Sequence, residues 1–268
     1  MIPNILSIAG SDPSGGAGIQ ADIKAISANG GYAMAALTAL TAQNTQGVTA
    51  VQMIAPDFVT AQVAAIRADI RVDAVKIGML GTAPIIGAVA DALAGLEAPI
   101  VLDPVMVAKS GDRLLQADAV AALRAMLPLA SVITPNLPEA ADLLGVPEAA
   151  TRNQMQEQAQ ALLALGARAV LLKGGHLPGG DCPDLLVSTD VLTWLTGSRH
   201  ATRKTHGTGC TLSSALATFL GLGLPLPDAA VRTKAYVAAA IANANALTVG
   251  SGHGPTHHFF AQFKGTNA

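Results

Sequence analysis

The sequence predicts an α/β protein with a mostly parallel sheet that carries helices on both faces. Short runs rich in Val, Ile and Leu alternate with amphipathic segments along the 268 residues, and several runs end at Gly, Asp or Pro. Strands that alternate with helices in this way pair in parallel through right-handed crossovers. Hydrophobic residues make up 51% of the chain and aromatic residues only 3%, so the core has to be built from small aliphatic side chains. Such side chains suit helices packed closely on a parallel sheet.

Each expected strand is a short apolar run closed by a turn-forming residue. The first, over Asn4–Ala9, ends at Gly10, and the run over Ala74–Ile77 ends at Gly78. Runs of this length with these ends are typical of buried strands. The other strands are expected over Ala35–Ala42, Val48–Ile54, Ile100–Leu102, Val132–Thr134 and Ala169–Lys173, with a hairpin over Leu185–Thr196.

The segments between the strands repeat apolar residues at helical spacing. Helices are expected over Ile19–Asn29, Asp57–Asp69, Pro84–Leu93, Ala117–Leu127, Pro138–Leu144, Asn153–Leu165, Thr211–Leu222 and Asp228–Leu247. No repeat or linker interrupts the alternation. The pattern therefore favours one domain over residues 1–268.

Charge and cysteine content narrow the class of partner. The formal net charge is −2 without a basic stripe, which argues against a nucleic-acid partner. No apolar segment is long and clean enough to predict a membrane span. Cys182 and Cys210 lack metal-ligand or redox-pair spacing, so we expect reduced thiols and a cytoplasmic location. The charge pattern favours a small-molecule ligand.

Ligands of parallel sheets bind beyond the carboxyl ends of the strands. This rule gathers on one rim the segments Gly10–Gly18, Gln43–Asn44, Gly78–Met79, Asp103–Pro104, Asn136–Glu139 and Lys173–His176. The glycines of the first segment allow backbone to approach a ligand closely. Their spacing is not that of the dinucleotide fingerprint, and the chain contains no Gly-Lys-Ser/Thr phosphate loop.

The turn Thr205–Cys210 is the strongest candidate for an anion site. Gly207 and Gly209 free the backbone so that successive amides converge, and the helix expected from Thr211 adds unpaired N–H groups. A thiol in this position, that of Cys210, is expected to have a lowered pKa. The alternative is a glycine cap before a core helix, with Cys210 as a small buried side chain.

Several motifs occur together, in order, along essentially the whole chain. They are Gly10–Gly18 with Gln20-Ala21-Asp22, Thr41–Thr45, Lys76–Leu80, Thr134–Ala140, Leu172–His176 and His206–Cys210. Together they resemble the hydroxymethylpyrimidine/phosphomethylpyrimidine kinases of the ribokinase-like superfamily. The resemblance implies a ribokinase-like fold and ATP-dependent phosphorylation of 4-amino-5-hydroxymethyl-2-methylpyrimidine. It also implies a second phosphorylation, of the monophosphate, to give the diphosphate used for thiamine.

The resemblance gives the turn a catalytic role. Cys210 would lie nearest the substrate hydroxyl, either as a base or only to position that hydroxyl. An anion hole for the transferring phosphoryl group would come from the backbone amides of Gly207, Thr208, Gly209 and Cys210. Most superfamily members carry Asp in place of Cys210, so the thiol favours a pyrimidine or pyridoxal substrate over a sugar.

Gln43 is expected to bind the substrate because its amide both donates and accepts, as the edge of an aminopyrimidine requires. The resemblance adds to the substrate side Gly10, Asp12, Asp22, Met79 and the backbone near Val105 and Val107. Each side chain also has a structural alternative. Asp12 would cap a turn, Asp22 would stabilise a helix end, and Met79 would fill the core.

The nucleotide side is expected to involve Asn136, Lys173, Thr205 and Lys234, with Glu139 and Asp103 as carboxylates for Mg²⁺. One or two carboxylates suffice for a Mg²⁺ that bridges nucleotide phosphates. The alternatives are exposed lysines and, for Glu139, a contact with a helix dipole alone. Residues 105–112 resemble a flap that closes over the substrate, and Ala108 stands where some pyridoxal kinases carry a second cysteine. This difference favours the pyrimidine.

The oligomeric state, the C-terminal histidines and the rival functions are the remaining expectations from the sequence. The resemblance implies a homodimer. His257 and His258 would point apart on an extended chain, so we interpret them and His253 as structural residues rather than metal ligands. The rival functions are a pyridoxal kinase of the same fold and a non-catalytic protein that binds a vitamin precursor.

Overall fold

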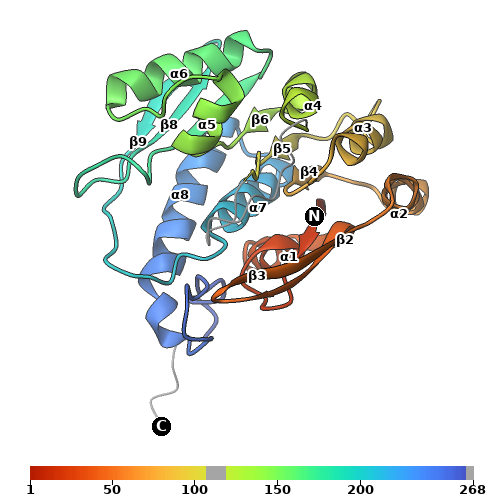
Figure 1. The fold of residues 1–268 in the computed structure, drawn as a ribbon, viewed down its shortest axis with the longest axis horizontal. Coiled ribbons are helices and arrows are strands. Elements are labelled where there is room, and N and C mark those ends of the chain that lie inside the picture. The colour runs from red at the N-terminus through yellow and green to blue at the C-terminus, as the bar shows by residue number, and fades with distance from the viewer. Residues whose placement is uncertain (107–118, 264–268) are drawn as a thin grey trace.

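The computed structural model describes residues 1–106 and 119–263. In these residues nine strands form one sheet in the order β3-β2-β1-β4-β5-β6-β7-β8-β9 (Figure 1). The strands are β1 (Asn4–Ser11), β2 (Tyr32–Asn44), β3 (Gly47–Met53), β4 (Ala74–Ile77), β5 (Ile100–Leu102), β6 (Val132–Ile133), β7 (Ala169–Lys173), β8 (Asp184–Ser188) and β9 (Leu192–Leu195). The six strands from β2 to β7 in this order are parallel, and β3, β8 and β9 add antiparallel edges. The predicted mostly parallel sheet is confirmed.

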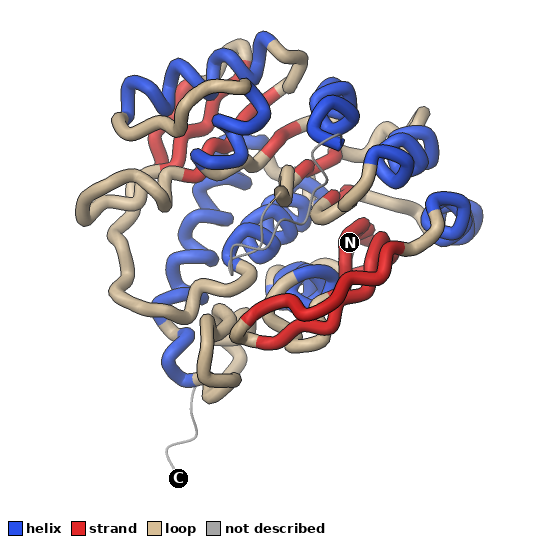
Figure 2. The backbone as a smooth tube through the Cα atoms, viewed as in Figure 1, coloured by secondary structure: helices blue, strands red, loops and turns tan. Residues whose placement is uncertain are grey.

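Helices cover both faces of the sheet, joined to the strands by loops (Figure 2). They are α1 (Gly18–Ala28), α2 (Pro56–Asp69), α3 (Ala83–Ala92), α4 (Ala119–Met126), α5 (Leu137–Leu144), α6 (Arg152–Ala164), α7 (Thr208–Gly221) and α8 (Leu226–Ala242), with one-turn 3₁₀ helices at Leu127–Leu129 and Ala244–Ala246. Helices α1, α7 and α8 pack on one face, and α2 to α6 pack on the other. Each face has its own apolar core.

Alternate residues of a strand point to opposite faces of the sheet. In β4, Val75 and Ile77 join the core beneath α2 to α6, whereas Ala74 joins the core beneath α7 and α8. Lys76 continues the row of Ala74, and it pairs in register with Ser7 of β1. Both polar side chains are fully buried. The α1–α7 face of the sheet therefore contains polar groups where an apolar row would be expected.

Several predicted elements are confirmed with their predicted bounds, namely the strands Ala74–Ile77, Ile100–Leu102 and Ala169–Lys173. The others differ at their ends. The last long helix ends at Ala242 rather than Leu247, because the chain leaves the α-helix at Asn243 and forms a separate 3₁₀ turn. The start of the helix predicted over Ala117–Leu127 lies outside the described residues. The predicted single domain is not tested by these observations and stays a prediction.

Helix α7 begins at Thr208, three residues earlier than the sequence predicted. Gly207 forms its N-cap with φ 73°, a left-handed conformation that favours glycine. The Thr211 amide donates to the Gly207 carbonyl at 2.8 Å and closes the first turn. A Cβ on Gly207 would also collide with the carbonyl oxygen of Gly16. Gly209 and Cys210 therefore lie in the first turn of the helix rather than in the preceding loop.

The segment after α8 returns to the turn between β2 and β3, where the amides of Gly252 and His253 donate to Thr45 at 3.1 and 2.8 Å.

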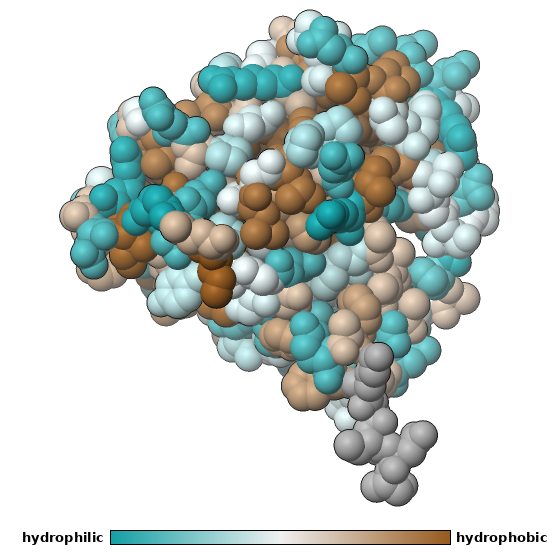
Figure 3. Space-filling view, turned by 180° about the vertical axis from the view of Figure 1, so that it is seen from behind, coloured by the Kyte–Doolittle hydropathy of each residue, from teal (hydrophilic) through white to brown (hydrophobic). Residues whose placement is uncertain are grey.

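On the face seen in Figure 3, apolar side chains gather near the middle and polar ones surround them. Within residues 1–106 and 119–263, no helix is long and apolar enough to cross a membrane.

Candidate active site

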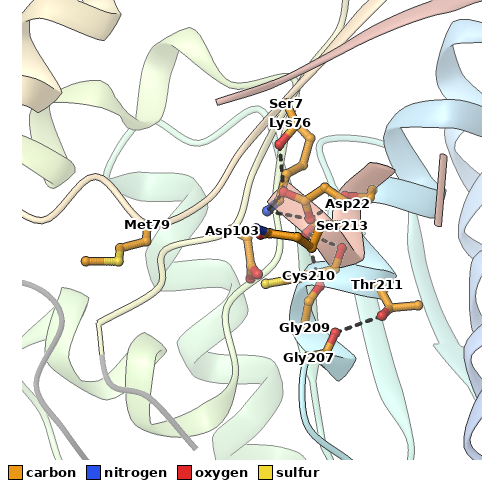
Figure 4. A network of polar contacts seen from close by, with 12 residues as sticks. Ser7, Asp22, Lys76, Met79, Asp103, Gly207, Gly209, Cys210, Thr211 and Ser213 are labelled. Carbon is orange, nitrogen blue, oxygen red and sulfur yellow. Dashed lines mark hydrogen bonds and ion pairs between the residues drawn. The ribbon is translucent and has the colours of Figure 1, made fainter. Parts of the chain in front are cut away.

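The carboxyl ends of the parallel strands and the first turn of α7 meet at one rim of the sheet. A Cβ placed on Gly209 would lie 3.2 Å from Asp103 Oδ2, just after β5, and 3.3 Å from Lys173 Nζ, at the end of β7. Figure 4 shows Asp103, Gly209 and Cys210 at this junction. Residues that are far apart in the sequence are thus brought together as the rim rule predicted.

A charged group lies on the outer side of this junction, and we call it the outer cluster: Asp103, Thr134, Glu139 and Lys173. Lys173 Nζ is 2.8 Å from Asp103 Oδ1 and 3.7 Å from Glu139 Oε2. The Thr134 hydroxyl donates to the same Asp103 oxygen at 3.1 Å. Burial acts to lower the pKa of Lys173, but the two carboxylates raise it on balance. The ammonium group therefore stays charged.

Glu139 has two neighbours of different kinds. With Asn136 it forms a capping box at the start of α5, in which Asn136 Oδ1 accepts from the Glu139 amide at 2.8 Å and Glu139 Oε2 accepts from the Asn136 amide at 2.7 Å. Its carboxylate also faces Lys173. Burial raises the pKa of Glu139 to about 7, with Lys173 acting against this and Asp103 adding to it. Glu139 therefore both caps the start of α5, which was its structural alternative, and belongs to the outer cluster.

The outer cluster fits a magnesium ion. Mg²⁺ takes oxygen ligands and is held by one or two carboxylates together with substrate phosphates. Asp103 and Glu139 supply two carboxylates beside one ammonium group, and their mutual repulsion contributes to the raised pKa of Glu139. A divalent cation would relieve that repulsion. In the described part of the chain no three His, Cys, Asp or Glu side chains gather as a metal site, so phosphates would have to complete the coordination.

The first turn of α7 offers fewer free amides than the sequence suggested. The Thr208 amide donates to the Thr205 carbonyl at 3.3 Å. Within the described residues the amides of Gly207, Gly209 and Cys210 donate to no acceptor. Free amides at a helix start form an anion site with the positive end of the helix dipole. The predicted contribution of Thr208 is therefore not available, because its N–H is already bonded.

Cys210 does not have the lowered pKa that its position at a helix start predicted. Burial raises the pKa of the thiol to about 11, even though Lys76 and the Gly18 amide act to lower it. Loss of solvation of the thiolate outweighs the favourable helix end. The thiol is therefore protonated at neutral pH.

A second charged group lies behind this turn, and we call it the inner cluster: Ser7, Asp22, Lys76 and Ser214. Figure 4 shows the first three of these residues. Lys76 Nζ is 2.9 Å from Asp22 Oδ1 and 2.8 Å from Oδ2. The hydroxyls of Ser7 and Ser214 donate to the same carboxylate at 2.6 and 2.8 Å. All four side chains are buried.

The inner cluster differs from the sequence prediction in the role of Asp22, and it contains Lys76, for which no role was predicted. Asp22 was expected to face the substrate, but its side chain is fully buried and bonded within the protein, so a direct substrate contact does not fit. Lys76 belonged to a quoted motif but received no role. A lysine inside the otherwise apolar run Ala74–Ile77 was the signal that could have singled it out.

On the substrate side, Asp12 and His206 form a buried pair. Asp12 Oδ2 is 2.7 Å from His206 Nε2, and Asp12 also accepts from the amides of Ser14 and Ala17 at 2.9 and 2.8 Å. Burial acts to raise the pKa of Asp12, but His206 and Ser14 lower it on balance. Gln43 Nε2 lies 3.5 Å from His206 Nε2. Asp12 therefore fixes the glycine-rich turn, and the sequence analysis missed His206 as the residue that joins it to Gln43.

Met79 lies apart from the two clusters, on the side toward the glycine-rich strand end. Its sulfur would be 3.0 Å from a Cβ on Gly10, and its carbonyl accepts from the Thr38 hydroxyl at 2.6 Å. Figure 4 shows the Met79 side chain pointing away from Cys210. The Val105 amide donates to the Asp103 carbonyl at 2.8 Å, while Val107 and most of the predicted flap lie outside the described residues.

The remaining predicted positions have structural partners. The ammonium of Lys234 is held by Asp184 Oδ2 at 2.7 Å and the Cys182 carbonyl at 2.6 Å. The Thr205 carbonyl accepts from the Thr208 hydroxyl at 2.7 Å. Nucleotide contacts of Asn136, Thr205 and Lys234 stay predictions. Both cysteines are free thiols.

Solved structures with the same fold give the class of protein. The structure of a Bacillus subtilis pyridoxal kinase in an ADP complex matches with a TM-score of 0.90 and 37% identity, covering 98% of this chain and 100% of that chain. A phosphomethylpyrimidine kinase from Clostridium difficile matches with a TM-score of 0.78 and 40% identity, covering 88% and 97%. The fold and the charged rim thus define a small-molecule kinase of the ribokinase-like class.

Sequence comparison gives the family. The family model described as phosphomethylpyrimidine kinase matches residues 12–257. A hydroxymethylpyrimidine/phosphomethylpyrimidine kinase of Rhizobium meliloti (strain 1021) is 52% identical over 260 residues, covering 97% of this chain and 98% of the relative. The chain belongs to the phosphomethylpyrimidine kinase family.

Proposed function

We propose that the protein transfers the γ-phosphoryl group of ATP to the hydroxymethyl group of 4-amino-5-hydroxymethyl-2-methylpyrimidine and then phosphorylates the monophosphate, for thiamine diphosphate synthesis. The main support is the junction of the α7 start with the outer cluster, which places free amides, an ammonium group and two carboxylates at one rim. Family membership supports the pyrimidine substrate, and the ADP complex of the Bacillus subtilis neighbour supports the nucleotide. A homodimer in the cytoplasm is part of the same proposal.

In the proposed reaction the substrate hydroxyl oxygen forms a bond to the γ-phosphorus while the bond to the ADP oxygen breaks. The hydroxyl proton passes to a phosphoryl oxygen or to water. The transition state of such transfers is loose in most analyses, so positioning and charge neutralisation supply most of the acceleration. The amides of Gly207, Gly209 and Cys210 and the ammonium of Lys173 would neutralise charge on the transferring group.

Cys210 has a positioning role in this proposal. Its thiol is protonated at neutral pH because burial raises its pKa to about 11, so it is not the resting base. Gln43 would bind the polar edge of the pyrimidine and Met79 its ring. Asp103 and Glu139 would hold Mg²⁺, which supplies charge neutralisation at the nucleotide phosphates when bound.

Phosphate transfer analysed by mass spectrometry tests the proposal. The purified protein is incubated with ATP and, separately, with the pyrimidine alcohol, its monophosphate and pyridoxal. We expect the alcohol to gain two phosphoryl groups in succession and the monophosphate to gain one, with the diphosphate as the final product of both. The fold match to a pyridoxal kinase makes transfer to pyridoxal the informative alternative. Transfer to pyridoxal alone would replace the proposal, and pyrimidine binding without ATP consumption would indicate a binding protein.

Replacing Cys210 tests its place in the site. We expect Cys210→Ala to keep pyrimidine affinity and to lose about 100-fold in turnover, because small misplacements of reacting groups have effects of this size. Calorimetric binding and steady-state kinetics measure the two quantities. Cys210→Ser, which keeps a small polar group, should lose less. Near-wild-type turnover of the alanine variant would remove Cys210 from the mechanism.

A further inference from the structure

A fully buried lysine lies behind the first turn of α7, and no step of the proposed transfer uses it. The Lys76 side chain is 0% exposed, and its ammonium group contacts both oxygens of Asp22. Burial acts to lower the pKa of Lys76, but Asp22, Cys210 and Asp103 raise it on balance. The ammonium group is therefore a fixed positive charge inside the protein.

Asp22 connects this charge to the helix that carries Cys210. Its Oδ1 accepts from the Ser214 hydroxyl at 2.8 Å. Cys210 and Ser214 are four residues apart on α7, so they lie on the same face, one turn from each other. Figure 4 shows the Lys76–Asp22 pair and Cys210 on the same side of the helix start. The inner cluster thus fixes the turn from behind.

The charges of Lys76 and Asp22 do not act equally on Cys210. Asp22 is compensated by two hydroxyls as well as by Lys76, whereas Lys76 bonds only to Asp22 among the described residues, with two of its three N–H donors. A Cβ on Gly78 would lie 2.5 Å from Lys76 Nζ, so this glycine provides the space for the ammonium group. Burial has the largest effect on the pKa of Cys210 and raises it. Lys76 has the next largest effect and lowers this pKa, whereas Asp22 and Asp103 each raise it by less. The positive end of the pair is therefore the one that Cys210 experiences.

We propose that Lys76 is a positioning residue of the phosphoryl-transfer site, whose buried ammonium group, compensated by Asp22, supplies a fixed positive potential at Cys210 and at the free amides of α7. The potential would strengthen an anion site made of three free amides in the described part of the chain. It would also explain why the core beneath α7 contains a charged pair instead of apolar side chains. This inference rests on the proposed function.

The rate of Cys210 alkylation by iodoacetamide tests the potential without using kinase activity. Measurements are made on the full chain in a Cys182→Ser background, across pH. Lys76→Met leaves the negative Asp22 and should move the midpoint of the pH dependence upward. Asp22→Asn keeps hydrogen-bonding groups but removes the negative charge, and should move the midpoint downward. Each shift should be about one pH unit, which is about tenfold in alkylation rate below the midpoint.

Lys76→Met and Asp22→Asn are expected to shift the midpoint of Cys210 alkylation in opposite directions. This difference separates an electrostatic role of the pair from a structural one. A pair that only stabilises the fold would leave both midpoints unchanged or move both to the ordinary thiol value of about 8.5, and either result would overturn the proposal. Because Asp22→Asn preserves volume, it gives the sign of the effect even if Lys76→Met does not fold. Ser214→Ala removes one hydrogen bond without changing charge, and its midpoint should stay near that of the parent.

Turnover gives the second measurement. Lys76→Met should lower kcat about tenfold or more while KM for ATP and for the pyrimidine changes little. Unchanged kcat would overturn the assignment to the transfer site. If the parent shows no transfer to the pyrimidine, the proposed function fails, whereas the alkylation midpoints still decide whether Lys76 acts on Cys210.

Discussion

The inner and outer clusters each contain a lysine–aspartate ion pair, and the surroundings of the two pairs differ. Lys76–Asp22 and Lys173–Asp103 both have N–O distances of 2.8 Å. The inner side chains are 0% exposed, whereas the Lys173 side chain is 13% exposed. Both Asp22 oxygens accept serine hydroxyls in addition to the lysine, so the inner pair is closed. The outer pair adds a third charge, Glu139, and lies against the free amides of α7.

This difference shows how one type of contact can stabilise a fold in one place and prepare a site in another. A closed pair has no remaining capacity for a ligand, and removing one partner leaves an uncompensated buried charge. The outer cluster has two carboxylates for one ammonium group, which is the imbalance that a cation would correct. We therefore expect inner variants to affect stability most and outer variants to affect turnover most.

Breaking the inner pair should have the largest effect. Lys76→Met is expected to lower the free energy of unfolding by about 3–5 kcal/mol, because Asp22 loses its buried partner. Urea unfolding measures the loss. The double variant Lys76→Met/Asp22→Leu should recover part of it, since it leaves no buried charge. Arg71→Met, which breaks an exposed pair with Asp73, is the matched control and should change stability much less. A loss from Lys76→Met as small as the control would contradict the comparison.

Breaking the outer pair should change activity more than stability. Asp103→Asn keeps the size of the side chain but removes its charge beside Lys173 and Glu139. We expect kcat to fall by about 10²–10³, as for the loss of one electrostatic group at a transfer site. The free energy of unfolding should fall less than in Lys76→Met, which denaturation of both variants checks. Full turnover, or a stability loss equal to that of the inner variant, would show that the two clusters do not differ as proposed.

The smallest expected effect is a pH dependence from Glu139. Its pKa is about 7 in the folded protein and 4.5 ordinarily, so the folded state binds the proton more tightly. The group therefore contributes stability below pH 4.5, and this contribution is lost as the pH rises through about 7. The difference between the two pKa values of Glu139 corresponds to at most about 3 kcal/mol in the free energy of unfolding.

Glu139→Gln keeps the capping box and should remove this component, so the variant gains stability relative to the parent between pH 4.5 and about 7. Unfolding measured across this range checks the sign. Parallel stability curves for the two proteins would mean that Glu139 keeps an ordinary pKa.

Much of the fold could be predicted because the pattern of apolar runs is local information. The four residues Ala74–Ile77 and the glycine after them defined a strand and its end before the structure was known. The start of α7 was misplaced because it depends on the contact between Gly207 and Gly16 and on a bond from the Thr211 amide. A contact between segments so far apart leaves no periodic signal in either of them.

The site was predictable in its location and less so in its electrostatics. The rim rule brought Asp103, Glu139 and Lys173 together, since all follow parallel strands. It gave no information on solvation, and the pKa of Cys210 was therefore predicted with the wrong sign. Burial depends on every element packed around a group, and a helix start described in isolation lacks those neighbours.

Spacing and residue type were enough to predict the parallel sheet, the glycine turn before α7 and the resemblance to a kinase family. The packing of the segments set the rest: Asp22 lies in the core with Lys76 as its partner, and the Cys210 thiol remains protonated. These properties arise from the removal of water and from distances between segments. Both are set when the sheet and α7 close on each other, and neither is a property of any one segment of the chain.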